Sequence, residues 1–194
     1  MKLHVPFYKS RKDTDCGPLA LKMVLEFFGE RHAFQEIARL EKRLSSGMVW
    51  SLGIARAAKK LGFPVRFFST ANFDVHDLKF YKKYANDKAM LVLKQLQKEM
   101  KQSMAEKDLS LKELLAYVSE RSVPIVLVNW FVIAGKDGFT GHFLPVTGHD
   151  TKYVYVNNSG IARAKAHLPI PKTVFLKAWE SKGTDKDTII IFRK

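Results

Sequence analysis

The sequence predicts an α+β domain in which helices come first and a mostly antiparallel sheet follows. Three observations predict this order. Apolar residues recur at helical spacing through most of residues 16–121, four β-rich runs separated by turn residues follow Pro124, and a length of 194 residues suits one domain. We therefore expect a single domain over residues 1–194, with a mainly helical half at 1–121 and a mainly β half at 122–194.

The composition limits the classes of partner and compartment. Lysine and arginine number 33 against 19 aspartates and glutamates, a net charge of +14 that favours anionic partners. The basic residues form no dense run and no nucleic-acid motif, so we do not expect nucleic-acid binding as the function. A single cysteine excludes an intramolecular disulfide and favours a reducing compartment. No apolar run approaches the ~18 residues of a membrane span, so we expect a cytoplasmic protein without one.

The first predicted helix carries the only cysteine. Thr14 and Asp15 are good N-cap residues, Pro18 suits the first turn, and Gly29 is a natural stop. Cys16 would then lie at the positive end of the helix, where unpaired backbone N–H groups favour the thiolate over the thiol. A buried packing role for this small side chain is the alternative.

The rest of the helical half is predicted from periodicity and end signals. We expect helices at 34–44 and 51–61, a strand at 63–68, an extended lead-in at 3–8 and a helical, lysine-rich stretch at 74–121. Within that stretch, Ser110 followed by Glu113 is a capping box. One helical stripe is expected to face the core, and it consists of Ala89, Leu93, Leu96, Met100 and Met104.

The β half places a histidine near an asparagine. We expect strands at 125–130, 141–148, 153–158 and 188–193, with a helix at 174–179. If the second and third strands form a hairpin around 149–152, its open end brings His142 beside Asn157 or Asn158.

A cysteine nucleophile needs a base and a group that orients the base. Asn158 could accept the Nδ1–H of His142 and hold Nε2 towards the Cys16 thiol, as in Cys-His-Asn enzymes. The structural alternatives are a satisfied strand histidine and an ordinary Asn-Asn-Ser-Gly turn. One cysteine and scattered histidines lack metal-ligand spacing, so we expect no metal and no cofactor.

Two segments resemble a known family. The segment from Asp15 to Leu25, with Val5-Pro6-Phe7-Tyr8 before it, resembles the opening of the bacteriocin-processing, double-glycine-leader cysteine peptidases. Gly141-His142-Phe143 and the strand ending at Asn158 resemble that family's histidine and acid strands, and the resemblance covers nearly the whole chain.

The resemblance implies a papain-like fold with Cys16 as nucleophile and His142 as general base and acid. Asn158 stands where the family usually has an aspartate. The oxyanion hole would combine the Cys16 backbone N–H with Ser10, which stands where the family usually has a glutamine. Because losing one such donor typically costs about 10²–10³ in rate, the chain could be a slow enzyme.

The function expected from these features is peptide hydrolysis through an acyl-thioester on Cys16, with cleavage after small residues as the resemblance suggests. Two alternatives stay open. One is a catalytically impaired, papain-like module that binds a peptide without cutting it. The other is an acyltransferase that passes the acyl group from the thioester to an amine.

Overall fold

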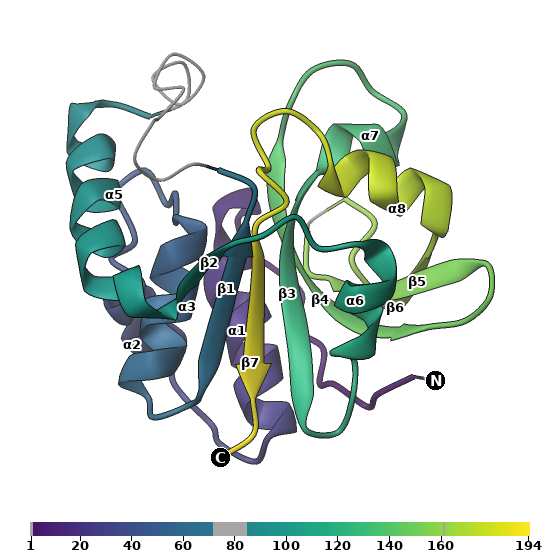
Figure 1. The fold of residues 1–194 in the computed structure, drawn as a ribbon, viewed down its shortest axis with the longest axis horizontal. Helices are drawn as coiled ribbons and strands as arrows, with labels where there is room; N and C mark the ends of the chain where they lie inside the picture. The colour runs from purple at the N-terminus through teal and green to yellow at the C-terminus, as the bar shows by residue number, and fades with distance from the viewer. Residues whose placement is uncertain (1, 72–84, 161) are drawn as a thin grey trace.

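The computed structural model describes residues 2–71, 85–160 and 162–194. The chain runs through helices and then strands in the order that the sequence predicts, and Figure 1 shows the arrangement. The helices are η1 Asp13–Asp15, α1 Cys16–Phe27, α2 Phe34–Leu40, α3 Ser51–Lys60, α5 Asp87–Met100, η2 Lys101–Ser103, α6 Leu111–Ala116, α7 Trp130–Ala134 and α8 Lys172–Trp179. The strands are β1 Val65–Ser69, β2 Met104–Glu106, β3 Ser122–Asn129, β4 Gly141–His149, β5 Tyr153–Asn158, β6 Lys165–Pro171 and β7 Thr188–Phe192.

The strands form one seven-stranded sheet in the order β2-β1-β7-β3-β4-β5-β6. Every neighbouring pair is antiparallel except β1 with β2, which is parallel. The α+β class is therefore confirmed. Strands β1 and β2 come from the half of the chain that the sequence predicts to be mainly helical, and they join the same sheet as the later strands.

Helices cover the sheet in two groups. Helices α1, α2 and α3 pack on one another; α1 contacts β3 and β4, α3 contacts β1 and β7, and α5 packs on α3. Helix α8 packs on β3, β5 and β6, and α7 packs on α8, as the right half of Figure 1 shows. This arrangement puts the start of α1 against β4, which positions the candidate site.

Several predicted helix ends are confirmed. Helix α1 ends before Gly29, whose φ of +97° is the left-handed conformation expected of a stop residue. The capping box of Ser110 and Glu113 is present at α6, and the predicted stripe residues Ala89, Leu93, Leu96 and Met100 are buried on α5. The second helix is shorter than predicted, since it ends at Leu40 and Lys42 has a φ of +54°.

Other elements differ from the prediction. Met104 was expected on the helical stripe but begins β2, and β6 and α7 were not predicted at all. The predicted strand at 125–130 starts earlier and ends at Asn129, so Trp130 begins a helix. The extended lead-in makes an isolated bridge between Lys2 and Gly148. The part of the 74–121 prediction that falls on residues 74–84 lies outside the described residues.

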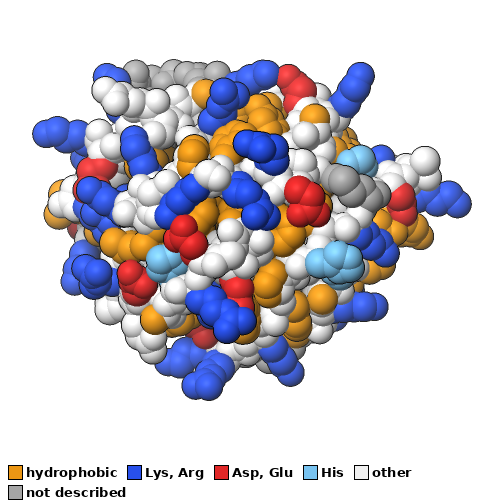
Figure 2. Space-filling model, turned by 90° about the horizontal axis from the view of Figure 1, so that it is seen from below, with side chains coloured by type: hydrophobic (Ala, Val, Ile, Leu, Met, Phe, Trp, Pro, Cys, Tyr) orange, Lys and Arg blue, Asp and Glu red, His pale blue; other side chains and the backbone are white. Residues whose placement is uncertain are grey.

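The surface carries the excess positive charge in a dispersed form. Figure 2 shows lysine and arginine side chains spread over one face, with acidic and apolar side chains between them. In the described ranges, no helix is long and apolar enough to cross a bilayer.

A glycine lets α3 approach the end of α2 closely. A Cβ atom added to Gly53 in α3 would lie 2.3 Å from the backbone carbonyl oxygen of Glu41, just after α2. That distance is far below van der Waals contact, and the obstacle is backbone. The helix pair can therefore pack at this distance only with glycine at position 53.

We predict that Gly53→Ala lowers the free energy of unfolding by roughly 1–3 kcal/mol, because the two helices must separate. Gly17→Ala is the matched control. Gly17 also lies in a helix, α1, but its Cβ would meet only the Val49 side chain, at 3.4 Å. There the gain in helix propensity, up to about 1 kcal/mol, opposes any strain. Urea unfolding of both variants measures the difference, and equal stabilities would contradict the prediction.

Candidate active site

Cys16 is the first residue of α1 and lies at the meeting point of that helix with β4. The short helix η1 delivers the chain to it, and the Cys16 side chain is 8% exposed. Asp15 occupies the N-cap position of α1 but its carboxylate does not cap the helix. The carboxylate instead accepts the Lys12 N–H at 3.0 Å and pairs with the Arg43 guanidinium at 2.7 Å. These bonds fix the turn that precedes the cysteine.

The structure brings His142 and Asn158 together and places His142 beside Cys16. The predicted hairpin is present, with β4 and β5 paired antiparallel, and Asn158 rather than Asn157 meets the histidine. His142 Nε2 lies 2.8 Å from Asn158 Oδ1. The expected bond from His142 Nδ1 to Asn158 is therefore wrong. Since Nε2 bonds Asn158, Nδ1 is the nitrogen left to bond the thiol.

Cys16 and His142 stabilise each other's charged forms. Burial opposes the thiolate, but the His142 charge, a hydrogen bond from His142 and the backbone N–H groups of Phe143 and Gly17 together lower the pKa of Cys16. Burial likewise opposes the imidazolium, yet the Cys16 thiolate raises the pKa of His142, helped by Asn158 and by the charge of Asp13. Each group therefore shifts the other towards the thiolate–imidazolium state, in which the sulfur is nucleophilic.

Asn158 is held so that its oxygen faces the histidine. Its Nδ2 donates to the carbonyl oxygen of Arg163 at 2.9 Å and to that of Ala162 at 3.4 Å. Its Oδ1 also accepts the backbone N–H of Gly160 at 3.0 Å. These contacts explain an amide at a position where the resemblance suggests an aspartate, since a carboxylate would face two carbonyl oxygens without a proton to donate.

Trp130 is a site residue that the sequence analysis missed. Its ring meets the His142 ring edge-on, with centroids 5.3 Å apart and planes at 62°. Asn129 places it by accepting the N–H groups of Phe131 and Thr140 and donating to Gly138. The signal was available, because an asparagine after an apolar run is a helix N-cap, but Trp130 was assigned to the strand.

Ser10 lies near the site, but its hydroxyl is already engaged. It is buried, its hydroxyl donates to the Lys12 carbonyl oxygen, and its backbone N–H donates to Ser159 at 2.8 Å. The hydroxyl would have to leave Lys12 before it could donate to an oxyanion. Ser10 instead ties the approach to α1 to the turn that follows Asn158.

Glu41 is a second group that the sequence analysis did not identify. It is fully buried, and among the described residues neither carboxyl oxygen has a hydrogen-bond partner. Burial raises its pKa well above the usual range, the Cys16 charge raises it further, and Arg43 opposes this. Burial therefore favours the neutral, protonated form of the Glu41 carboxyl.

A metal set is not part of the arrangement. Across residues 2–71, 85–160 and 162–194, no three histidine, cysteine, aspartate or glutamate side chains gather into a group that could hold an ion.

We predict that Asn158→Asp destabilises the protein by about 1–3 kcal/mol, because the carbonyl oxygens of Ala162 and Arg163 lose their donor and face a negative charge. The matched control is Asn86→Asp, at a helix N-cap where the side chain accepts the Ala89 N–H. Asparagine and aspartate serve equally well there. Thermal unfolding compares the two, and a stabilised Asn158→Asp protein would contradict our account of the amide.

We also predict that Glu41→Met stabilises the protein, by about 1–3 kcal/mol at pH 8, because the buried acid no longer has to hold its proton. Because the pKa of Glu41 is raised in the folded protein, Glu41 ionises at lower pH in the unfolded chain than in the fold. The free energy of unfolding of the wild-type protein therefore falls as pH rises above ~4.5. The gain should therefore shrink towards pH 4.5. Urea unfolding at both pH values measures it, and a gain that does not depend on pH would show that Glu41 is ionised in the fold.

Three solved structures share the fold over almost the whole chain. The peptidase domain of Streptococcus ComA, a bi-functional ABC transporter, is 19% identical with a TM-score of 0.59, covering 98% of this chain and 100% of that one. A double glycine motif protease from an AMS/PCAT transporter, in complex with its leader peptide, is 16% identical with a TM-score of 0.57, covering 100% and 94%. A protein described as a C39-like peptidase from Bacillus anthracis is 14% identical with a TM-score of 0.63, covering 100% and 98%.

These similarities show a papain-like cysteine peptidase fold, as the resemblance implied. The sequence family is a different one. The family model that matches spans residues 5–191, nearly the whole chain, and is described as guanylylate cyclase. The protein thus has the fold of the bacteriocin-processing peptidase domains, and by its sequence it belongs to the guanylylate cyclase family.

Proposed function

We propose that this protein is a cysteine hydrolase that cleaves a peptide or amide through an acyl-thioester on Cys16. The observation that carries the proposal is the buried Cys16–His142 pair, with Asn158 bonded to the far nitrogen of the imidazole. The peptidase fold supports it, and a structural neighbour bound to a leader peptide supports a peptide as the substrate.

The proposed reaction gives each of these groups a step. The Cys16 thiolate attacks the carbonyl carbon, and the negative charge that develops on oxygen faces the first turn of α1. The His142 imidazolium gives its proton to the leaving amine, and the C–N bond breaks. Neutral His142 then takes a proton from water as the water oxygen attacks the thioester carbon. The C–S bond breaks, the carboxylic acid leaves, and the Cys16 thiolate and the His142 imidazolium are restored. Asn158 keeps the ring in place through both transfers.

The two alternatives differ from hydrolysis in one step each. A peptide-binding module would keep the pocket but never form the thioester, and an acyltransferase would let an amine replace water. Ser10, whose hydroxyl is bonded to Lys12, supports slow chemistry, since one oxyanion donor is engaged elsewhere. The lowered pKa of Cys16 favours an enzyme over a module that only binds.

The first test is the reactivity of the thiol. We expect iodoacetamide to alkylate Cys16 readily at pH 6, because His142 keeps the sulfur as a thiolate. His142→Ala should slow alkylation at that pH by about tenfold or more, since each unit of thiol pKa changes the thiolate fraction tenfold. Mass spectrometry of the intact protein gives the rate.

His4→Ala is the matched control, because His4 is exposed on the extended lead-in. Alkylation that follows an ordinary thiol titration in the wild-type protein, with no dependence on His142, would overturn the proposal.

The family description favours a second candidate, cyclisation of guanosine triphosphate. This reaction would not need a thiol nucleophile, so Cys16→Ala separates the two candidates. Incubation with guanosine triphosphate and Mg²⁺, followed by chromatography for the cyclic nucleotide, tests it. A product formed equally by wild-type and Cys16→Ala protein would favour the cyclase and contradict the hydrolase.

A further inference from the structure

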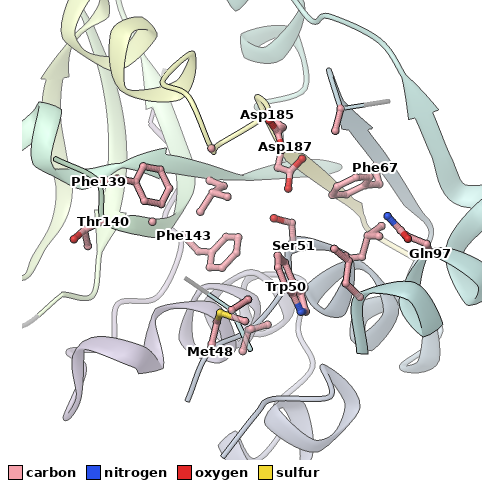
Figure 3. A pocket seen from close by; sticks show the side chains of 18 residues that line it. Met48, Trp50, Ser51, Phe67, Gln97, Phe139, Thr140, Phe143, Asp185 and Asp187 are labelled. Atoms are coloured by element: carbon pink, nitrogen blue, oxygen red, sulfur yellow. The ribbon is translucent and has the colours of Figure 1, made fainter. Parts of the chain in front are cut away.

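A cavity of about 370 Å³ lies between the helices and the sheet. Its walls come from the segment leading into α3, from α5, from β1, β3 and β4, and from the turn before β7. Figure 3 shows Trp50 and Ser51, Phe67, Phe143 and Asp187 around this space. The mechanism proposed above assigns no role to the cavity.

The cavity adjoins the catalytic cysteine. The backbone N–H of Phe143 hydrogen-bonds the Cys16 sulfur, and Phe143 also lines the cavity. Val49 also lines the cavity, and its side chain lies 3.4 Å from the position that a Cβ on Gly17, the residue after Cys16, would take. A substrate whose carbonyl carbon reaches Cys16 can therefore place a neighbouring group in this cavity.

The walls are mostly apolar, while one end is acidic. The polar lining side chains include Asp185 and Asp187, and none of the described lining residues is a lysine or arginine, although the chain carries 33 of them. Asp187 is partly exposed, accepts hydrogen bonds from Ser51 and Ser69, and has no ion-pair partner among the described residues. Burial raises its pKa to about 7, as expected of a carboxyl without a cation.

Lys186, the cationic residue of the turn before β7, pairs with acidic residues other than Asp187. Asp185 and Lys186 both have a φ of +50°, an uncommon conformation for residues other than glycine. The Lys186 ammonium lies 3.3 Å from Glu180, also pairs with Asp108, and sits over the Trp179 ring. The turn therefore leaves Asp187 in the cavity wall without neutralising it.

The span from Phe143, whose N–H bonds the Cys16 sulfur, to Asp187 fits a long side chain. Phe143 pairs with Leu127 across β3 and β4, and the Leu127 N–H donates to the Asp187 carbonyl at 3.0 Å. Two strand spacings thus separate Phe143 from Asp187, roughly 10 Å. A substrate Cα bound next to the thiol, about 3–4 Å away, followed by a lysine stem of about 6 Å, covers that distance.

We propose that this cavity binds a lysine or arginine side chain of the substrate, on the acyl side of the bond that Cys16 attacks, with its cationic end at Asp187. The proposal rests on the hydrolase function above. The apolar walls contact the hydrocarbon stem, and Asp187 supplies the charge that the head needs in a desolvated site. It replaces the expectation of cleavage after small residues with a preference for a long basic one.

The test compares two reagents that differ only in the terminal cation. Acetyl-lysine chloromethyl ketone and acetyl-norleucine chloromethyl ketone alkylate a cysteine by displacement of chloride. We expect the lysine reagent to label Cys16 at least about tenfold faster in the wild-type protein. Equal rates, or faster labelling by norleucine, would overturn the proposal without any variant being needed.

Variants then assign the preference to the cavity. Asp187→Asn should abolish it, whereas Asp137→Asn, an exposed carboxyl outside the cavity lining, should retain it. Thr140 is exposed at the cavity, and its hydrogen bonds to Trp130 and Asn129 are made by its backbone. Thr140→Lys should therefore fold. Its ammonium should reduce the preference for the lysine reagent several-fold. Thr140→Gln reports the effect of bulk alone. A preference that survives both Asp187→Asn and Thr140→Lys places the cation elsewhere.

Two measurements separate this proposal from the hydrolase function. Iodoacetamide rates report whether the thiol is activated, whatever the cavity binds. Calorimetry with Cys16→Ala protein and acetyl-lysine methylamide reports the cavity alone, with acetyl-norleucine methylamide and guanosine as comparisons. Tighter binding of guanosine than of the lysine amide would overturn the basic-side-chain proposal even if the thiol is reactive.

Discussion

The buried contact between Cys16 and His142 is the interaction on which the rest of the site depends. The two side chains are only 8% and 6% exposed, so water does little to stabilise either charge. Each charge is therefore stabilised mainly by the other and by fixed backbone N–H groups. The stability of such a pair depends strongly on the distance between its members. If the two groups move slightly apart, each becomes a buried charge that lacks a close partner.

The groups around the Cys16–His142 pair add little further charge to it. Asn158 is neutral, and bonds to backbone carbonyl oxygens fix its amide, so the group that orients the imidazole adds no third charge to the pair. Burial raises the pKa of Glu41, and the Cys16 charge raises it further, so the neutral form of this carboxyl is the one that suits the thiolate. Asp15, the acid next to the cysteine in sequence, is paired with Arg43. Asp15 therefore adds no unpaired charge next to the nucleophile.

Local sequence signals predicted the helix and strands that carry the site. They did not predict features that depend on tertiary contacts, such as β2 and the ring orientation of His142. The Gly29 stop and the hairpin between β4 and β5 have short-range causes, so Cys16, His142 and Asn158 could be identified from the chain alone. Strand β2 has only three residues and forms because β1 offers a parallel edge, which no local pattern encodes. The ring orientation of His142 and the burial of Glu41 depend on packing between segments far apart in sequence.

The fold suggests peptide hydrolysis, and the family description suggests cyclisation of a nucleotide. The charges around Cys16 favour one of these reactions over the other. The first turn of a helix stabilises one anion well, either a thiolate or a phosphate. In this structure His142 and backbone N–H groups already stabilise the thiolate at that place. A nucleotide phosphate brought to the same turn would meet that negative sulfur, and the acidic end of the cavity would repel it as well. A polyphosphate and a reactive Cys16 are therefore poor neighbours, whereas a neutral amide carbonyl that becomes negative only during attack suits the same groups.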